Sequence, residues 1–273
     1  IGENYSVHSG KQRIYGYAPK SGEMIDGPST TDIAAFNGSD SFVNIGEANT
    51  RWRPLIGDTS TTQKLTFTAW IKVFVHTFNN DQEDTPIIDV SGKLRFAVTP
   101  NGRLYFQDRR RVVSPGTWRS INGVITRGVW QHVAVKHTFD DPAKNPILYI
   151  NGVAVTTIRE GSYSGSLQAF GAGDFLIGKN TGLGRLNGFV SNVGIWSDIL
   201  TANQISRIYK AGQTSTEALG YTTNLEAYYQ FSRSPYQSIA GDTTTIIQDR
   251  SGNNLDSIEV GVTTIDTYFD TLG

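Results

Sequence analysis

The segment GVWQHVAV, residues 128–135, carries a histidine in a pattern that could do chemistry, because His132 follows Trp130 by two positions. Histidine suits proton transfer near neutral pH, but catalysis also needs a nucleophile or an orienting carboxylate within hydrogen-bonding distance. No sequence motif supplies such a partner. Strand alternation would place Trp130 and His132 on one face of a sheet and Val133 on the other. We therefore expect His132 to pack rather than to transfer protons.

Other catalytic routes find equally little support. The motif GSYSG at 161–165 has Tyr163 where a nucleophile elbow needs serine. Glycoside hydrolysis needs two carboxylates that flank the scissile bond. The acidic stretches NNDQEDTP at 79–86 and FDDPAKNP at 139–146 are turn-like and contain proline, which favours solvated loops. A carboxylate pair that forms only on folding stays an open alternative.

Positive charge is concentrated in one part of the chain. Six arginines and one acid lie between Arg103 and Arg127, so this window carries +5 in a chain whose net charge is −1. The planar guanidinium suits sulfate, phosphate and carboxylate, and an exposed tryptophan can stack on a sugar ring. We predict that this window, with the smaller motif RWRP at 51–54, binds an anionic glycan or an acidic protein surface. The candidate residues are Arg109, Arg110, Arg111, Trp118, Arg119 and Trp52. The alternative is a solvated edge in which Trp118 is buried.

Several acidic residues in turn-like segments offer the oxygen ligands that calcium prefers. They are Asp40, Asp140, Asp141 and Asp249. Asp249 opens the segment DRSGNN, whose residue types are equally typical of a turn. Calcium is therefore a candidate cofactor, and its binding residues stay undetermined.

The composition excludes several classes of function. The chain has 273 residues with 24 basic and 25 acidic side chains, so no overall positive field attracts nucleic acid. It has no cysteine, which removes disulfides and thiolate chemistry. No apolar run approaches the roughly 20 residues of a membrane-spanning helix. We expect partners to be bound by local surface patches.

Short apolar segments that end in turn residues recur from residue 34 onward, for example LTFTAWIKVFV and LYINGVAV. The dipeptides Ser91-Gly92, Asn101-Gly102 and Asn151-Gly152 are typical of turns that join antiparallel strands. Many short strands without intervening helices indicate an all-β sandwich or barrel.

One helix is expected, in the segment SDILTANQISRIYKAG. Thr201 and Gln204 have the spacing of a capping box, Leu200 and Ile205 lie at the staple positions, and Gly212 can end the helix. Its apolar residues share one face, so we predict that this short helix plugs one end of the sheets.

Seven segments, in order across about residues 34–212, resemble the laminin-G-like, concanavalin A-like jelly-roll family. They are FNGSDSFVNIG, FTAWIKV, GVWQHVAVKHTF, LYINGVAV, FLIGKN, GFVSNVGIW and LTANQISRIYKAG. The resemblance implies an all-β fold, a two-sheet antiparallel jelly-roll sandwich with one short helix and with loops gathered at the rim. It also implies a structural strand at 130–132, and some members hold calcium at the rim. The E-x-D-x-x-E strand of the family's laminarinase-like hydrolases is absent here.

One departure from the family pattern concerns the chain ends. The family often has an AYxxF segment followed by D-x-SGN before the first matched strand, whereas here AYYQF lies at 227–231 and DRSGNN at 249–254. The resemblance then implies that the two ends of the chain meet in one sheet. We expect residues 225–231 to pair close to residues 34–45.

These patterns favour a non-catalytic recognition or adhesion module that binds a glycan or a neighbouring protein, in an extracellular location or on a virion surface. Two alternatives stay open: a virion decoration or appendage protein whose main role is assembly, and a glycan hydrolase with an unrecognised acid pair. Residues 1–33 are polar and rich in Gly, Ser, Thr and Pro, and we interpret them as an extended arm before a single domain at 34–273. Such an arm could link copies of the chain into a homo-oligomer.

Overall fold

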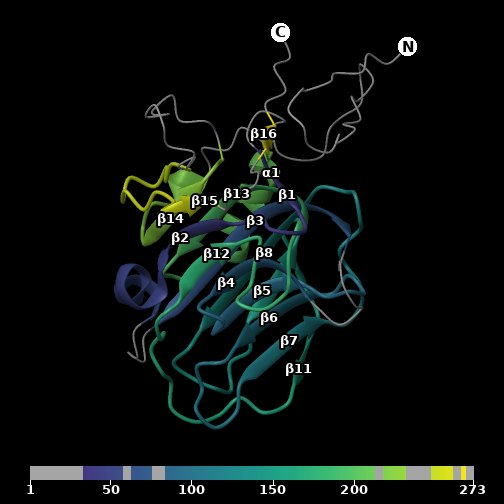
Figure 1. The fold of residues 1–273 in the computed structure, drawn as a ribbon. Coiled ribbons are helices and arrows are strands. Elements are labelled where there is room, and N and C mark those ends of the chain that lie inside the picture. Colours follow the sequence, from purple (N-terminus) through teal and green to yellow (C-terminus); the bar gives the residue numbers. More distant parts are fainter. Residues whose placement is uncertain are drawn as a thin grey trace, which may run out of the picture.

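In the computed structural model the placed residues are 33–57, 63–75, 84–212, 218–231, 247–260 and 266–268. The predicted N-terminal arm lies outside these described residues apart from Ile33, and so do His8 and His76. The strands form two antiparallel sheets packed face to face, as the family resemblance implies (Figure 1).

Sheet A has eight strands, and β14 (Leu225–Tyr229) pairs with β13 beside the main path. The path runs in the order β10 (Val153–Val155), β9 (Ile147–Ile150), β8 (Gln131–Thr138), β3 (Lys64–Val75), β13 (Asn187–Trp196), β1 (Ile33–Asn37) and β16 (Asp266–Tyr268).

Sheet B also has eight strands. Their order is β11 (Thr157–Glu160), β7 (Gly116–Ser120), β6 (Leu104–Asp108), β5 (Leu94–Val98), β4 (Thr85–Val90), β12 (Asp174–Ile177), β2 (Val43–Glu47) and β15 (Glu259–Val260). Figure 1 shows the strands from β2 to β11 following one another across the front of the molecule.

The predicted glycine turns join antiparallel strands, as expected. Ser91 and Gly92, between β4 and β5, have φ values of 54° and 64°. Asn151 and Gly152, between β9 and β10, have φ values of 48° and 75°. Positive φ at both central residues matches the right-handed twist of the flanking strands, which is why these residue types mark hairpins.

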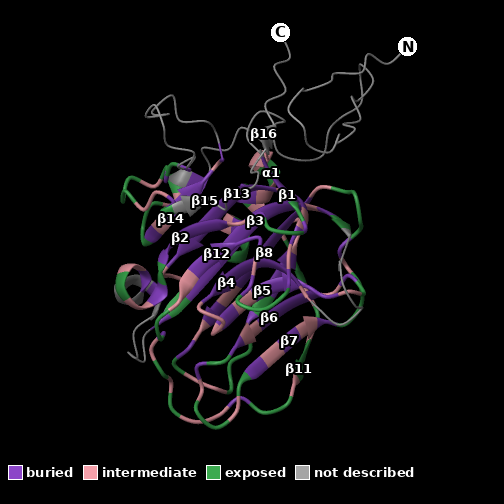
Figure 2. Cartoon of the chain, viewed as in Figure 1, coloured by how far each residue is buried: buried purple, intermediate pink, exposed green. Residues whose placement is uncertain are grey.

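The core lies between the two sheets and follows the alternation along the strands. Val133 and Val135 of β8 face this core, whereas Ala134 belongs to a second apolar cluster on the other side of sheet A. Figure 2 shows the strands largely buried and the exposed residues gathered in the connecting loops. Alternation thus makes one face of each strand core and leaves the other for a cover or a ligand.

Helix α1 (Ala202–Ala211) has the predicted capping box. The N–H of Gln204 donates to the Thr201 hydroxyl at 3.2 Å, and the Thr201 N–H donates to the Gln204 side chain at 2.7 Å. Gly212 follows the last turn with a φ of 56°. Two further short helical segments are η1 (Ala48–Gly57) and η3 (Ala218–Gly220).

The position of α1 corrects the prediction that it plugs one end of the sheets. Ile205 and Ile208 pack with Tyr149, Trp196 and Tyr228 on the outer face of sheet A. These large side chains point away from the inter-sheet core and need their own apolar cover. The helix therefore covers a sheet face.

The chain ends meet in one sheet, as predicted. Strand β1 pairs with β13 at residues 187–190, and β14 pairs with the same edge of β13 at residues 193–196. Strands β1 and β14 therefore lie end to end along β13, and each pairs with β13. The C-terminal strands β15 and β16 add to β2 and β1.

Candidate functional site

His132 of β8 lies beneath helix α1 and is fully buried. The centroid of its ring is 5.6 Å from that of Trp70 and 6.2 Å from that of Tyr209. Burial lowers the pKa of His132 to about 3, so the imidazole is neutral at physiological pH. The predicted packing role is confirmed, because no solute can reach this side chain.

The arginine triplet at 109–111 splits into one exposed residue and two structural ones. Arg110 is fully buried, and its guanidinium donates to Asp108 Oδ1 and to Gln63 Oε1, each at 3.1 Å. Arg111 donates to two backbone carbonyls at 2.9 and 2.6 Å. Arg109 is exposed. Arg110 therefore cannot contact a ligand, which corrects that part of the prediction.

The structure contradicts the expectation of exposed indoles at Trp118 and Trp52. Both side chains are 0% exposed. Trp118 of β7 faces the inter-sheet core and its Nε1 donates to Asn145 Oδ1 at 2.8 Å. Trp52 of η1 donates to the Ile45 carbonyl at 2.8 Å. Neither ring can stack on a sugar, because strand alternation and the η1 turn direct both into the core.

Arg119, the next residue of β7, points to the outer face of sheet B. Its guanidinium forms an ion pair with Glu160 of β11 and lies 5.1 Å from the ring centroid of Tyr105. The side chain keeps 29% of its surface exposed. Ligand contact by Arg109 and Arg119 stays a prediction.

A row of polar side chains crosses the outer face of sheet B, and we call it the polar row. Glu160, Thr117, Gln107, Arg95 and Asp89 occupy facing register positions on β11, β7, β6, β5 and β4. Gln107 Nε2 donates to Thr117 Oγ1 at 3.2 Å, and Arg95 Nε donates to Asp89 Oδ2 at 2.9 Å. These bonds fix donors and acceptors on a rigid sheet.

Two groups on this face have shifted pKa values. Burial raises the pKa of the Asp89 carboxyl, and the Arg95 guanidinium, the Gly92 N–H and the charge of Arg109 oppose that shift. Burial, together with the negative charge of Asp84, raises the pKa of Tyr105 to about 12. Both shifts follow from the low polarity of a partly covered sheet face.

The 178–186 loop covers the β4 side of the polar row. A Cβ atom on Gly92 would lie 2.8 Å from Thr181 Oγ1, so the loop contacts the turn after β4. A Cβ atom on Gly184 would lie 2.6 Å from the Asp84 carbonyl oxygen, so the loop also contacts the start of β4. The loop thus contacts both ends of β4. The row residues on β5, β6, β7 and β11 stay partly exposed.

A shallow hollow of about 430 Å³ continues the outer face beyond the ends of β5 and β6. The residues that line it are Ser91, Gly92, Lys93, Arg109, Pro115 and Thr181. The Arg109 N–H donates to the Lys93 carbonyl at 2.7 Å, which extends the β5–β6 ladder by one position. Lys93 and Arg109 therefore lie opposite each other, two residues along from Arg95 and Gln107. We call this feature the basic hollow.

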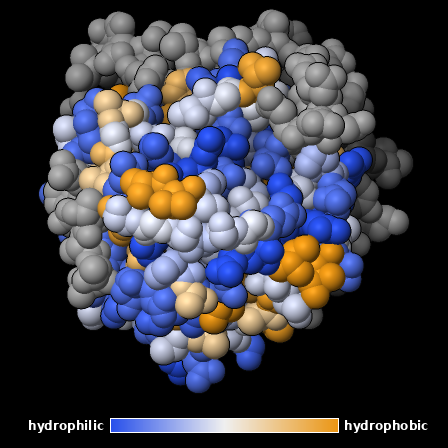
Figure 3. Space-filling model, turned by 90° about the horizontal axis from the view of Figure 1, so that it is seen from below, coloured by the Kyte–Doolittle hydropathy of each residue, from blue (hydrophilic) through white to orange (hydrophobic). Residues whose placement is uncertain are grey.

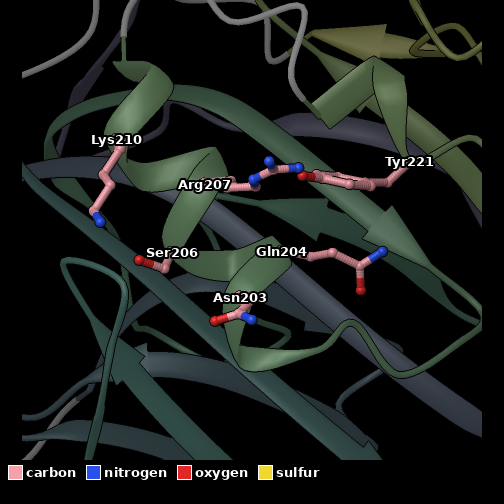
Figure 4. A pocket seen from close by; sticks show the side chains of 6 residues that line it. All are labelled: Asn203, Gln204, Ser206, Arg207, Lys210 and Tyr221. Atoms are coloured by element: carbon pink, nitrogen blue, oxygen red, sulfur yellow. The ribbon is translucent and has the colours of Figure 1, made fainter.

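A second hollow lies on helix α1. It is lined by Asn203, Gln204, Ser206, Arg207, Lys210 and Tyr221. Figure 4 shows that these side chains fan out from the helix: Arg207 extends toward Tyr221, while Lys210 and Ser206 lie on the other side of the helix. Gln204 is already engaged in the capping box. The groups do not converge on one point, so this hollow is the weaker candidate.

The acids predicted as calcium ligands do not gather into one site. Asp249 lies beneath β14, and its carboxylate accepts four hydrogen bonds, two of them from Ser251. Asp140 forms an ion pair with Lys144. Within the part of the chain that is described, no group of three or more His, Asp or Glu residues is arranged to hold a metal ion. Asp249 fits the turn-forming alternative.

Apolar surface is scattered. Figure 3 shows separate apolar patches among hydrophilic residues on the face seen from below. Val113 and Val112, in the loop between β6 and β7, are 74% and 50% exposed. No helix among the described residues has the length and apolar character to cross a membrane. The organised features of the surface are therefore the polar row and the basic hollow.

Sequence reasoning missed most of the polar row. Arg95, Gln107 and Thr117 belong to the strand segments LRFAV, LYFQD and GTWRS, in which polar and apolar residues alternate. That alternation is a signal for one solvent-facing side. The register that aligns the three residues is set by the pairing of the strands and is absent from any single segment.

Comparisons with known proteins agree with this architecture. Residues 37–206 match the profile of the family described as the concanavalin A-like lectin/glucanases superfamily. A search of curated proteins gives no match.

Among solved structures, a protein from Bacteroides ovatus described as "a putative carbohydrate binding protein" has a similar fold, with a TM-score of 0.52 and 19% identity over 86% of this chain and 60% of that one. A heptameric SAP-like pentraxin from Limulus polyphemus gives a TM-score of 0.46 and 17% identity over 68% of this chain and 85% of that one. The CBM40 of the Ruminococcus gnavus IT-sialidase gives a TM-score of 0.47 and 12% identity over 64% of this chain and 96% of that one. The family match covers more than half of the chain, and the chain therefore belongs to the concanavalin A-like lectin/glucanase superfamily.

Proposed function

We propose that the protein is a non-catalytic module that binds glycans across the outer face of sheet B. The observation that carries this proposal is the polar row, in which Arg95, Gln107, Thr117 and Glu160 align on four successive strands. A sugar offers a dense set of hydroxyl donors and acceptors, and such a ligand is held best by polar groups whose own positions are fixed. The sheet and the Gln107 to Thr117 hydrogen bond provide that rigidity.

The fold supports the same proposal. The Bacteroides ovatus protein with a similar fold is described as a "putative carbohydrate binding protein", which agrees with a carbohydrate ligand here. A module of this kind meets polysaccharides outside the cell or on a virion, so an extracellular or virion-surface location accompanies the proposal.

The carboxylates of the polar row are badly placed for hydrolysis. Asp89 and Glu160 are four strand spacings apart, about 19 Å, whereas glycosidases hold their two carboxylates about 5–10 Å apart. A different pair, Glu47 and Asp174, occupies facing positions on β2 and β12. This pair is the one to examine if hydrolysis is found.

The experiment is a glycan-binding screen with the intact chain, followed by variants. We expect Gln107→Ala with Thr117→Ala to weaken binding of a hit by about thirtyfold, since each of the two removed hydrogen bonds is worth about 1 kcal/mol. Gln168→Ala, an exposed change outside the row, is the matched control. Equal affinities for the double variant and the control would refute the site. Release of reducing ends that Glu47→Gln or Asp174→Asn abolishes would refute the non-catalytic role.

A second candidate function is assembly, with another copy of the chain as the partner. Among the described residues, β10 and β11 are edge strands of sheets A and B. Residues 153–158, which comprise β10 and the first half of β11, carry no charged side chain, and β11 then ends in Arg159 and Glu160. Val153 is 68% exposed and Ile158 is 42% exposed. Uncharged exposed edges invite pairing with a second chain, and monomeric proteins usually protect them with lysine or proline.

Assembly is tested by light scattering after size exclusion. If this edge joins two copies, the wild type has at least twice the mass of one chain, and Val153→Lys returns it to the mass of one. A wild type that runs as a single chain at high concentration would remove this candidate and leave glycan binding untouched.

A further inference from the structure

The two positive charges that line the basic hollow, Lys93 and Arg109, form no ion pair within 4 Å among the described residues, whereas their neighbours Arg95 and Arg110 do. Arg95 pairs with Asp89 at 2.9 Å, and Arg110 pairs with Asp108 at 3.1 Å. Lys93 forms no ion pair among the described residues.

Arg109, like Lys93, forms no ion pair among the described residues. No described carboxylate lies within ion-pair distance of its guanidinium, and no acid lines the hollow. The nearby Asp89 is fully buried behind the turn, and its two oxygens already accept from Arg95 and from the Gly92 N–H at 2.8 Å. Arg109 is still near enough to the buried Asp89 for its charge to lower the pKa of that carboxyl, but it does not contact it. Lys93 and Arg109 thus lie at facing positions of the ladder, and both line the hollow.

Holding two cations side by side costs electrostatic energy, which an anion at the same place would recover. The backbone makes the arrangement rigid, because the Arg109 N–H donates to the Lys93 carbonyl. A planar guanidinium binds carboxylate or sulfate oxygens through two N–H groups, and an ammonium adds a compact charge beside it.

We infer that the basic hollow holds the carboxylate or sulfate group of an acidic glycan, with Lys93 and Arg109 as its charge partners. This inference rests on the proposed glycan-binding function and names the class of its ligand. Thr181 lines the same hollow, and its hydroxyl can bond to a sugar hydroxyl group. Ser91 Oγ already donates to the Ala172 carbonyl at 3.0 Å, so it can only accept.

The geometry favours a glycan over an acidic peptide. Lys93 and Arg109 are each two residues from a member of the polar row, Arg95 or Gln107, which is about 7 Å along a strand. One oligosaccharide can therefore place an acidic group in the hollow and neighbouring hydroxyls on the row. The lining of the hollow is rich in hydroxyl and charged groups and has a single apolar residue, Pro115.

The test compares acidic and neutral probes by calorimetry at two salt concentrations. The acidic probes are a heparin-derived tetrasaccharide and a galacturonic acid trisaccharide, and the neutral probes are cellotriose, mannotriose and galactotriose. We expect Lys93→Ser and Arg109→Ser each to weaken binding of an acidic probe by about tenfold and to reduce its salt dependence. Binding of a neutral probe should change less than twofold. Arg127→Ser, which removes the same charge from an exposed loop position, is the matched control.

Each outcome decides at least one of the two claims, the acidic ligand of the basic hollow and glycan binding by the polar row. If neutral probes bind as tightly as acidic ones and Arg109→Ser behaves like Arg127→Ser, the hollow is not an anion site, while glycan binding by the polar row stands. If no glycan binds but poly-glutamate does, the hollow recognises acidic protein and both claims fall. If no probe binds at all, both claims also fall. Urea midpoints of Lys93→Ser and Arg109→Ser that equal the wild-type midpoint would show that any loss of binding is local.

Discussion

The guanidinium Nε of Arg110 lies 3.1 Å from Oδ1 of Asp108, and neither side chain has exposed surface. Tyr163 donates to the other oxygen of this carboxylate at 2.5 Å, which ties the loop after β11 to the end of β6. The Arg110 guanidinium also lies 4.1 Å from the ring centroid of Phe139. The middle residue of the arginine triplet is therefore a structural cross-link between the layers.

Removing that cross-link should be costly. Arg110→Ala leaves the buried Asp108 carboxylate without its counter-charge, and we expect the free energy of unfolding to fall by about 3–5 kcal/mol. Urea denaturation measures the loss. Arg127→Ala, which removes an exposed arginine, should change stability by less than about 0.5 kcal/mol. Adding Asp108→Asn to the Arg110→Ala variant should restore part of the loss. Equal stability of Arg110→Ala and Arg127→Ala would contradict a structural role for the Arg110–Asp108 pair.

Gly116 is required by the packing of Trp118. A Cβ atom at this position would lie 2.0 Å from the Trp118 ring and 2.7 Å from the Tyr163 ring. Gly116→Ala should therefore overpack the core and lower the free energy of unfolding by about 1–3 kcal/mol. Gly171→Ala is the control, because no atom lies within 4 Å of its Cβ position. A neutral Gly116→Ala variant would show that the indole can move aside.

The two buried histidines should make stability depend on pH. Burial lowers the pKa of His132 to about 3 and that of His137 to about 4, from an ordinary value of 6.5. The unfolded chain therefore takes up protons first, so stability is complete above pH 6.5 and falls as the pH drops from 6.5 toward 4. At pH 5 each histidine should cost about 2 kcal/mol relative to pH 7.5.

Urea denaturation at pH 7.5, 6 and 5 measures this decline. His132 is surrounded by aromatic rings, and His137 also feels the charges of Asp108, Arg110, Arg111 and Asp140. His132→Leu should remove about half of the loss between pH 7.5 and 5. A flat stability profile over this range in the wild type would mean that neither imidazole is buried in its neutral form.

The capping box of α1 offers a small and well-defined change. Thr201→Ala removes the acceptor of the Gln204 N–H, and we expect the free energy of unfolding to fall by about 1 kcal/mol. Thr201→Ser keeps the hydroxyl and should stay within a few tenths of a kcal/mol of the wild type. Thermal denaturation followed by circular dichroism would separate the two, and identical midpoints would show that the cap is dispensable.

The sequence by itself determined the features that depend on local chemistry. Alternation placed Val133 in the core and His132 on the opposite face, and the spacing of Thr201 and Gln204 marked the start of α1. Turn residues with positive φ marked the hairpins, as at Asn151. The order of the strand segments identified the family. Apart from the order of the segments, these signals act within a few residues, where propensity and periodicity are decisive.

The tertiary structure alone decided which polar residues face a partner. Arg109, Arg110 and Trp118 belong to one segment, yet the first is exposed and the other two are buried. The polar row needs the register of five strands, and the basic hollow needs the turn at Lys93 to meet the end of β6. Burial of a side chain depends on what packs over it from distant parts of the chain, and local sequence does not contain that information.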